Sequence, residues 1–294
     1  MTLNLALDVT YGVRRLRPGS MHRVAQPAQR AGGKGVNVAR VLHALGEPVI
    51  VTGLSGGSTG RDIDADLEAA GIAADLVEIA AETRRTLTVM DGEAGEATLF
   101  NEPGPPVSEA EWNAFLARYE TLAGQATVVV LSGSLPRGLP EDAYATLIRA
   151  TTTPVILDAD GRALRLGAAA GPRIVKPNAA ELAAATGESD PRTGALKLGA
   201  GAVVVSRGPG GMTVYGESDW SAVPPRDVRG NATGAGDAAV AALARGLAAG
   251  SPWPDRLADA VALSAAAVAA PLAGDFDAGL YATLRAQVRA VPLP

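Results

Sequence analysis

Cysteine is absent from the 294-residue chain, and histidine occurs only at His22 and His43. The first absence excludes disulfides, thiol catalysis and cysteine-based metal sites. With only two imidazoles, a histidine-rich metal centre is excluded as well. The chain also lacks an excess of basic residues, because its formal net charge is −5. Since proteins that bind nucleic acid usually carry a basic face, we expect no nucleic-acid partner.

Long apolar runs are missing too. The most apolar stretch, residues 257–270, contains Asp259 and is too short to span a bilayer. The first eight residues have no basic start and include Asp8, which makes them a poor signal peptide. We therefore expect no membrane partner and a cytoplasmic location. A composition that is 47% hydrophobic can bury a large core.

Short apolar runs alternate with amphipathic segments along most of the chain. Apolar side chains at helical spacing begin at Val38, Trp112 and Val240, and each series predicts a helix. The runs predict strands at residues 3–6, 49–53, 127–131, 155–158, 173–175 and 202–206. This order predicts an α/β fold with a mainly parallel sheet that helices cover on both faces, as a single domain over residues 1–294.

Two segments interrupt this alternation. Residues 11–25 and 85–100 resemble short strand pairs, and the second pair turns at Asp91 and Gly92. We expect the two segments to form one small β appendage inserted into the domain. Ser108 and Glu111 have the spacing of a capping box and predict a helix start. Residues 275–288 predict a final helix.

The sequence around Asp237 carries the strongest chemical signal. Gly234, Ala235 and Gly236 leave a predicted helix start without bulky side chains, so its N–H groups and dipole can face an anion. Asp237 follows in the first turn, where a carboxylate could accept a proton from a hydroxyl. An anion site beside a base is the local chemistry of phosphoryl transfer, although the same residues also begin ordinary helices.

Polar or glycine-rich residues follow several of the predicted strands. Ligands bind outside the carboxyl ends of the strands in open α/β sheets, so these residues predict one crevice along that edge. The residues concerned are Ser132 to Ser134, Asp158, Lys176 to Asn178 and Ser206 to Gly208.

Asn178 and Glu181 allow two interpretations. As a helix start, Asn178 is the N-cap and Glu181 closes a capping box. In a functional interpretation, both side chains organise the water shell of Mg²⁺, an ion that keeps several waters and takes few carboxylates. A phosphate site in the same crevice favours the second interpretation.

Two glycine-rich segments precede or follow predicted elements. Residues 32–37 could let the backbone approach a ligand while Asn37 donates to a sugar hydroxyl, or they could form a plain turn. Lys34 is followed by glycine, so the segment is not a Walker A loop. Residues 206–211 could lie beneath a nucleotide or form a tight turn. Arg84, Arg137 and Lys176 are candidate cations for phosphate.

Five of these segments, in this order, resemble the ribokinase-like carbohydrate kinases of PfkB type over nearly the whole chain. Within that family, the chain looks like the phosphosugar branch, which contains 1-phosphofructokinase and tagatose-6-phosphate kinase. It departs from the branch at Leu5, where proline is usual, and at Thr86 and Thr88, where asparagine and lysine are frequent. The segments are residues 32–40, 53–60, 132–138, 176–181 and 233–237.

The resemblance implies a Rossmann-like domain with a β lid that closes over the sugar and often forms a dimer interface. It also implies a role for each matching residue. Asp237 would be the catalytic base, with an anion hole at Gly234, Ala235 and Gly236. The acceptor would be bound by Asp8, Gly33, Lys34, Asn37, Arg84, Asn101 and Arg137. The nucleotide would be bound by Lys176, Ser206, Gly208 and Gly211, and the metal would be organised by Asn178 and Glu181.

The activity implied is ATP- and Mg²⁺-dependent transfer of a phosphoryl group to a ketohexose monophosphate, such as fructose 1-phosphate or tagatose 6-phosphate, by a homodimer. Three alternatives remain at this point. The same fold serves kinases of unphosphorylated sugars and nucleosides. A non-catalytic sugar or nucleotide sensor is the second. The third is dinucleotide binding through Gly234, Gly236 and Ala239, which the late position of this motif in the chain disfavours.

Overall fold

The computed structural model describes residues 1–293, and a seven-stranded sheet lies at its centre. The strand order is β13-β12-β11-β10-β9-β8-β7, with parallel pairing from β7 to β10 and antiparallel pairing from β10 to β13. The strands are β7 (Val129–Ser132), β8 (Val155–Asp158), β9 (Ile174–Val175), β10 (Val203–Ser206), β11 (Met212–Tyr215), β12 (Trp220–Ala222) and β13 (Ala290–Pro292).

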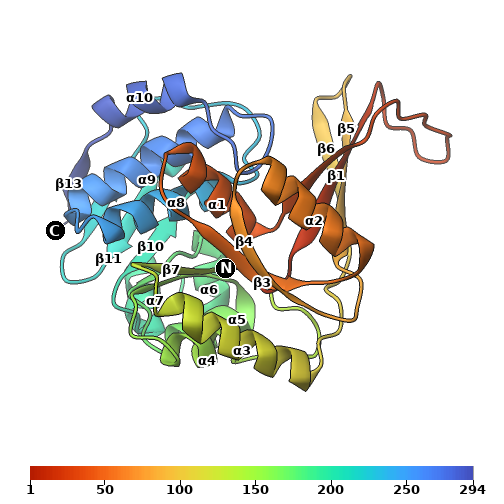
Figure 1. The fold of residues 1–294 in the computed structure, drawn as a ribbon. Helices are drawn as coiled ribbons and strands as arrows, with labels where there is room; N and C mark the ends of the chain where they lie inside the picture. Colours follow the sequence, from red (N-terminus) through yellow and green to blue (C-terminus); the bar gives the residue numbers. More distant parts are fainter. Residues whose placement is uncertain (294) are drawn as a thin grey trace.

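Helices cover both faces of this sheet (Figure 1). One face carries α3 (Glu109–Ala123), α4 (Ala143–Arg149), α5 (Gly161–Ala168), α6 (Ala179–Thr186) and α7 (Pro191–Leu198). The other carries α1 (Lys34–Ala44), α8 (Ala235–Ala248), α9 (Trp253–Val268) and α10 (Ala278–Gln287). Each helix layer contributes buried aliphatic side chains to its own core cluster, as the predicted two-faced arrangement requires.

A second sheet of four strands rises from the body and forms the lid, at the upper right of Figure 1. Its order is β2-β1-β5-β6, with β1 parallel to β5 and the other pairs antiparallel. The strands are β1 (Ala6–Val13), β2 (Ala28–Gly32), β5 (Arg84–Asp91) and β6 (Glu96–Asn101). A parallel pair, β3 (Ile50–Ser55) and β4 (Ala73–Glu78), and helix α2 (Gly57–Ala69) complete the described elements.

The prediction of a mainly parallel sheet is correct only for one half of the central sheet. Residues 212–222 form an antiparallel pair of strands, because the short connection between β11 and β12 allows only a hairpin. The predicted strands at 49–53, 127–131, 155–158, 173–175 and 202–206 are confirmed within a few residues as β3, β7, β8, β9 and β10. The capping box of Ser108 and Glu111 is present at the start of α3.

The strand pair predicted at residues 85–100 is confirmed as β5 and β6, whereas the strand pair predicted at 11–25 is wrong. The first pair of lid strands is β1 with β2, and most of residues 14–27 connects them. Leu7 and Val9, which bury against the body of the domain, place the first strand earlier than the predicted segment. The strand predicted at 3–6 is wrong as well, since β1 begins only at Ala6, where pairing with β2 and β5 begins.

Among residues 1–293, the structure contains no helix that combines the length and the apolar character needed to cross a bilayer.

Candidate active site

Asp237 lies in the first turn of α8, where its carboxylate is buried with 6% exposure. Asn37, in the first turns of α1, donates its side-chain amide to Oδ2 of Asp237 at 2.8 Å. Two helix starts are therefore joined at this carboxylate. The sequence assigned Asn37 to a sugar hydroxyl; in the structure its side-chain amide contacts the candidate base, and the contact with a sugar stays a prediction.

The pKa of Asp237 is raised to about 7, mainly because burial penalises the charged form and secondly because the negative charge of Asp158 is near. The hydrogen bond from Asn37 and the charges of Lys34 and Lys176 oppose this rise. A carboxyl group that titrates close to neutral pH is suited to accept a proton from an alcohol.

Asp158, at the end of β8, holds two lysines beside Asp237. Lys176 Nζ lies 3.3 Å from its Oδ1, and Lys34 Nζ lies 3.6 Å from its Oδ2. Ser132, at the end of β7, donates to the same Oδ2 at 3.2 Å. Burial works to lower the pKa of Lys34, but nearby carboxylates, Asp158 first, outweigh it and raise that pKa. The ammonium group of Lys34 thus stays charged in the crevice.

The start of α8 is open toward these lysines. Gly234 is the N-cap in a left-handed conformation, with φ of 85°, and no side chain caps the helix. The Ala235 amide donates to the carbonyl of Ala232 at 3.2 Å, so an anion meets chiefly the following amides of the first turn. A Cβ at Gly236 would lie 3.5 Å from Lys176 Nζ. The predicted anion hole therefore adjoins a buried cation.

Asp8, a predicted acceptor residue, lies on β1 of the lid, opposite Arg30 of β2 and Thr86 of β5 in the strand register. Burial raises the pKa of Asp8, while Arg84 and the Thr86 hydroxyl act against the rise. A Cβ at Gly32 would come within 2.1 Å of the Asp8 carboxylate, so any other residue there would force this carboxylate to move. Asn101, the last residue of β6, pairs with Thr86 and extends this row across the sheet.

Arg84 and Arg137 gather around Asn4. Arg84 Nε donates to the side-chain oxygen of Asn4 at 3.1 Å, and Asn4 in turn donates to Ser134 at 2.9 Å. Arg137 Nε donates to the carbonyl of Gly104 at 3.0 Å, and a Cβ at Gly104 would touch the Asn4 side chain. The two predicted phosphate cations thus line one polar corner, which also receives the end of β7.

Both sides of the capping box at the start of α6 are formed. Asn178 Oδ1 accepts from the amide of Glu181, and Glu181 Oε2 accepts from the amide of Asn178, each at 2.8 Å. The helix-start interpretation is therefore confirmed. The negative charge of Glu181 helps to raise the pKa of Lys34. Asn178 also forms an isolated β-bridge with Ser206 of β10. The box thus lies beside the segment 206–211, which the sequence predicted for the nucleotide.

The two predicted nucleotide glycines differ in their surroundings. Gly208 begins a 3-10 turn, and a Cβ there would meet no atom within 4 Å. At Gly211 a Cβ would come within 2.0 Å of the Ala222 carbonyl of β12. Gly211 therefore allows close packing of the hairpin, whereas Gly208 borders open space. Gly33, with φ of 103°, is the N-cap of α1 and turns the chain from the lid into the body.

Most of the residues that the sequence singled out thus converge on one edge of the sheet. The function of Asp158 as the partner of both lysines was not predicted, although its position at a strand end was a signal. Asn4 was missed because no motif marks its contact with Arg84. Among residues 1–293, three or more acidic or histidine side chains nowhere gather into a metal cluster.

The chain is similar to known proteins in both sequence and fold. The profile of the pfkB family carbohydrate kinases matches residues 2–277. A 1-phosphofructokinase of Xanthomonas campestris pv. campestris is 37% identical over 263 residues, which cover 84% of this chain and 83% of that protein. Phosphofructokinase-2 from Escherichia coli in complex with potassium is 29% identical, with a TM-score of 0.90 and 97% of each chain covered. The same enzyme in complex with fructose-6-phosphate is 30% identical, with a TM-score of 0.87 and coverage of 96% of this chain and 98% of that one.

Proposed function

Because the chain belongs to the pfkB family of carbohydrate kinases, we propose that it transfers the γ-phosphoryl group of ATP to fructose 1-phosphate. The observation that carries the proposal is the buried carboxylate of Asp237, with a pKa near 7, between Asn37 and two lysines at an open helix start. The similarity to a 1-phosphofructokinase over most of both chains supports this acceptor.

In the proposed reaction, the ionised Asp237 accepts the proton of an acceptor hydroxyl, and the oxygen forms a bond to the γ-phosphorus while the bond to ADP breaks. Amides at the start of α8 and the ammonium of Lys176 stabilise the charge on the transferring group. Asn37 keeps the carboxylate oriented. The contribution of the chain is positioning and electrostatic stabilisation, as in other phosphoryl transfers.

The residues near Lys34 fit a magnesium ion that is held mainly by substrate. Mg²⁺ keeps several waters and takes few protein carboxylates, so exposed Asn178 and half-buried Glu181 suffice where no acidic cluster exists among residues 1–293. When bound, the ion would neutralise charge on the phosphates of the donor. Arg84 and Arg137, around Asn4, are suited to the phosphate that the acceptor already carries.

The remaining parts of the proposal concern the nucleotide, the assembly and the location. The open space beside Gly208 would take the nucleotide, next to Ser206. The lid exposes Met90 and Leu99, with 38% and 47% exposure, and we propose that a second copy covers them in a homodimer. An enzyme of this kind would work in the cytoplasm.

The test measures ADP release with ATP, Mg²⁺ and a panel of acceptors: fructose 1-phosphate, fructose 6-phosphate, tagatose 6-phosphate, ribose and adenosine. We expect the highest kcat/KM with fructose 1-phosphate and a bisphosphate as product. A preference for ribose or adenosine would replace the proposal by a kinase of unphosphorylated acceptors. Specific binding of sugar and ATP without ADP release would identify a sensor.

A further inference from the structure

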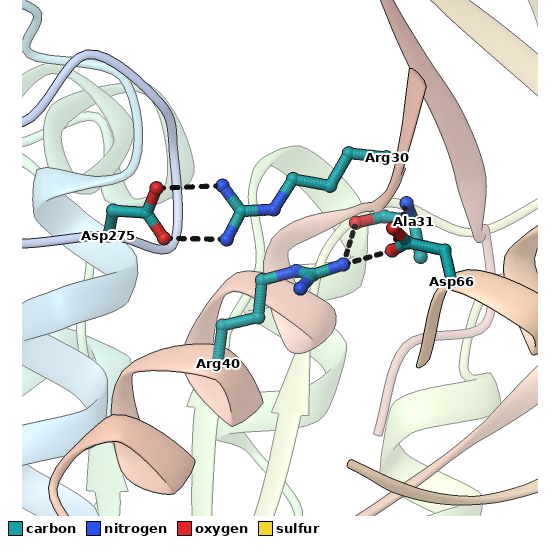
Figure 2. Close-up of polar contacts among 5 residues, drawn as sticks. All are labelled: Arg30, Ala31, Arg40, Asp66 and Asp275. Carbon is teal, nitrogen blue, oxygen red and sulfur yellow. Dashed lines mark hydrogen bonds and ion pairs between the residues drawn. The ribbon is translucent and has the colours of Figure 1, made fainter. Parts of the chain in front are cut away.

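An ion pair joins the lid to a distant loop of the body. Arg30 of β2 donates through both terminal nitrogens to the two carboxylate oxygens of Asp275, at 2.9 and 2.6 Å (Figure 2). Asp275 lies in the connection between α9 and α10, 245 positions away in sequence. Such two-pronged contacts fix orientation as well as distance. None of the functions described above uses either residue.

The loop that carries Asp275 forms a wall of the candidate anion site. A Cβ at Gly234, the N-cap of α8, would lie 2.9 Å from Ala273 Cα. A Cβ at Gly274 would lie 3.2 Å from Asn37 Cα. The residues immediately before Asp275 therefore press on the helix start and on the residue that orients Asp237. A shift of this loop would therefore displace both the start of α8 and Asn37.

Arg30, at the other end of the pair, belongs to the acceptor row of the lid, by which we mean Asp8 and the residues opposite it in the register. It is directly opposite Asp8 in the register of β1 and β2, and Thr86 continues the row on β5. Opposite residues in a sheet project from the same face. The positive charge of Arg30 acts on the Asp8 carboxyl, where it helps to oppose the rise in pKa that burial causes.

A second ion pair, between helices α1 and α2, holds β2 in place. Arg40 of α1 contacts Asp66 of α2, and Asp66 also accepts from the amide of Ala31, next to Arg30 (Figure 2). Burial lowers the pKa of Arg40, and the like charge of Arg30 lowers it further. Without Asp275, the Arg30 side chain would be repelled by the nearby charge of Arg40 and would lose the carboxylate that holds it toward the loop.

We propose that Arg30 and Asp275 are positioning residues that couple the acceptor row of the lid to the anion site of α8. The pair aligns Asp8 and the bound sugar with Asp237 and closes the wall formed by Ala273 and Gly274. Correct alignment favours transfer to the sugar hydroxyl over transfer to water. This inference rests on the proposed phosphoryl transfer, but not on the identity of the acceptor.

The experiment is a double-mutant cycle with Arg30→Gln, Asp275→Asn and the double variant, measured on the acceptor that the wild type phosphorylates fastest. We expect each single change to raise the acceptor KM about five- to tenfold, in the range of typical coupling between sites. The share of ATP hydrolysed without acceptor phosphorylation should rise as well. The double variant should be no worse than the poorer single variant. Arg30→Lys should recover part of the loss.

The matched control is Arg118→Gln, which breaks a similar two-pronged pair between α3 and Asp75 of β4. It should leave KM and the hydrolysis share unchanged, and melting curves exclude unfolding as the cause in every variant. Additive losses in the cycle, or wild-type KM and coupling in both single variants, would overturn the proposal. Failure of fructose 1-phosphate as acceptor would affect only the proposed function, because the cycle then runs on another acceptor.

Discussion

The protonation of Asp237 is the central event at the scale of single residues. Its carboxyl group is buried, shares a hydrogen bond with Asn37 and lies near the negative charge of Asp158. Burial and this like charge keep the pKa close to neutrality, so a large part of the groups is ionised at physiological pH. The lysines on Asp158 prevent a still higher value. The base is thus adjusted by its neighbours and not by the motif alone.

The pH dependence of catalysis follows from this environment. Since only the ionised carboxylate accepts a proton, we expect kcat/KM to fall about tenfold per pH unit below a midpoint near 7. Asp158→Asn removes the like charge and frees two lysine charges, so its midpoint should move to lower pH. Initial rates between pH 5 and 9 measure both midpoints. Equal midpoints in the two proteins would argue against this origin of the pKa.

The sequence predicted the chemistry of single residues better than their contacts. The glycines and Asp237 were identified because helix starts and anions impose local rules. The pairing of Asn37 with Asp237 was not predicted, since it joins positions 200 apart in the chain. Arg30 was missed for the same reason, because its register with Asp8 depends on which strands pair. Long-range partners of this kind need the fold.

At the scale of elements, the start of α8 determines whether an anion can approach. Gly236→Ala would place a methyl group 3.5 Å from Lys176 Nζ, an ordinary contact that leaves the helix intact. In the proposed reaction, the methyl group would nevertheless occupy space that the migrating phosphoryl group needs. We expect kcat/KM to fall by about 10²-fold, near the lower end of losses for a removed oxyanion donor, without a lower melting temperature.

Gly279→Ala is the matched control for this change. Its added Cβ would also meet its nearest atom, Asp277 Oδ1, at 3.5 Å, but in the first turn of α10. Its kinetics should be those of the wild type. Wild-type activity in Gly236→Ala as well would mean that the anion binds elsewhere.

Three helices depend on one buried carboxylate. Asp259 of α9 accepts from Arg245 of α8 at 2.6 Å and from the Tyr281 hydroxyl of α10 at 2.7 Å, and it also pairs with Arg285. Asp259→Asn would leave these partners without their shared negative charge. We expect the free energy of unfolding to fall by about 2 kcal/mol, less than for a fully buried pair because both arginines are partly exposed.

Denaturant unfolding measures this loss, with Glu188→Gln as the control that breaks an exposed pair with Lys197. The control should cost less than about 1 kcal/mol. If the free energy of unfolding fell by the same small amount in both variants, Asp259 would not be what holds the three helices together.

Elements that follow local rules were the ones predicted well. The helices with clear stripes and the two capping boxes are present as expected. The strand predicted at 11–25 failed because strand β1 is defined by its pairing with β2 and β5 and not by its own composition. The antiparallel half of the central sheet was missed because short strands such as β12 carry little periodic signal.

At the scale of the whole molecule, the lid is the part with the least buried sheet. Every residue of β6 is exposed, and Leu99 and Met90 lie on the same face as the acceptor row, since Thr88 opposes Leu99. Such a face is costly in a monomer, and a second copy would cover it. In this proposed arrangement, the lid would serve both the acceptor and the assembly.

Leu99→Asp tests this arrangement, because it places a charge in the middle of the proposed contact. We expect sedimentation to give twice the mass of the 29.6 kDa chain for the wild type and the mass of one chain for the variant. Leu196→Asp, at an apolar residue with 75% exposure on α7, should remain dimeric. A monomeric wild type would rule out the dimer.

The most direct test of the account is the turnover of Asp237→Asn with ATP and the preferred acceptor, with Asp62→Asn on the exposed side of α2 as control. We predict a loss of at least about 10²-fold. The pKa of Asp237 is raised to about 7 in the folded protein, so between its ordinary pKa and that value the folded state binds more protons than the unfolded one. Asp237 therefore lowers the free energy of unfolding increasingly as the pH rises through this window. The variant should therefore melt no lower than the wild type at pH 8. Turnover within about twofold of the wild type would contradict the assignment of Asp237 as the base.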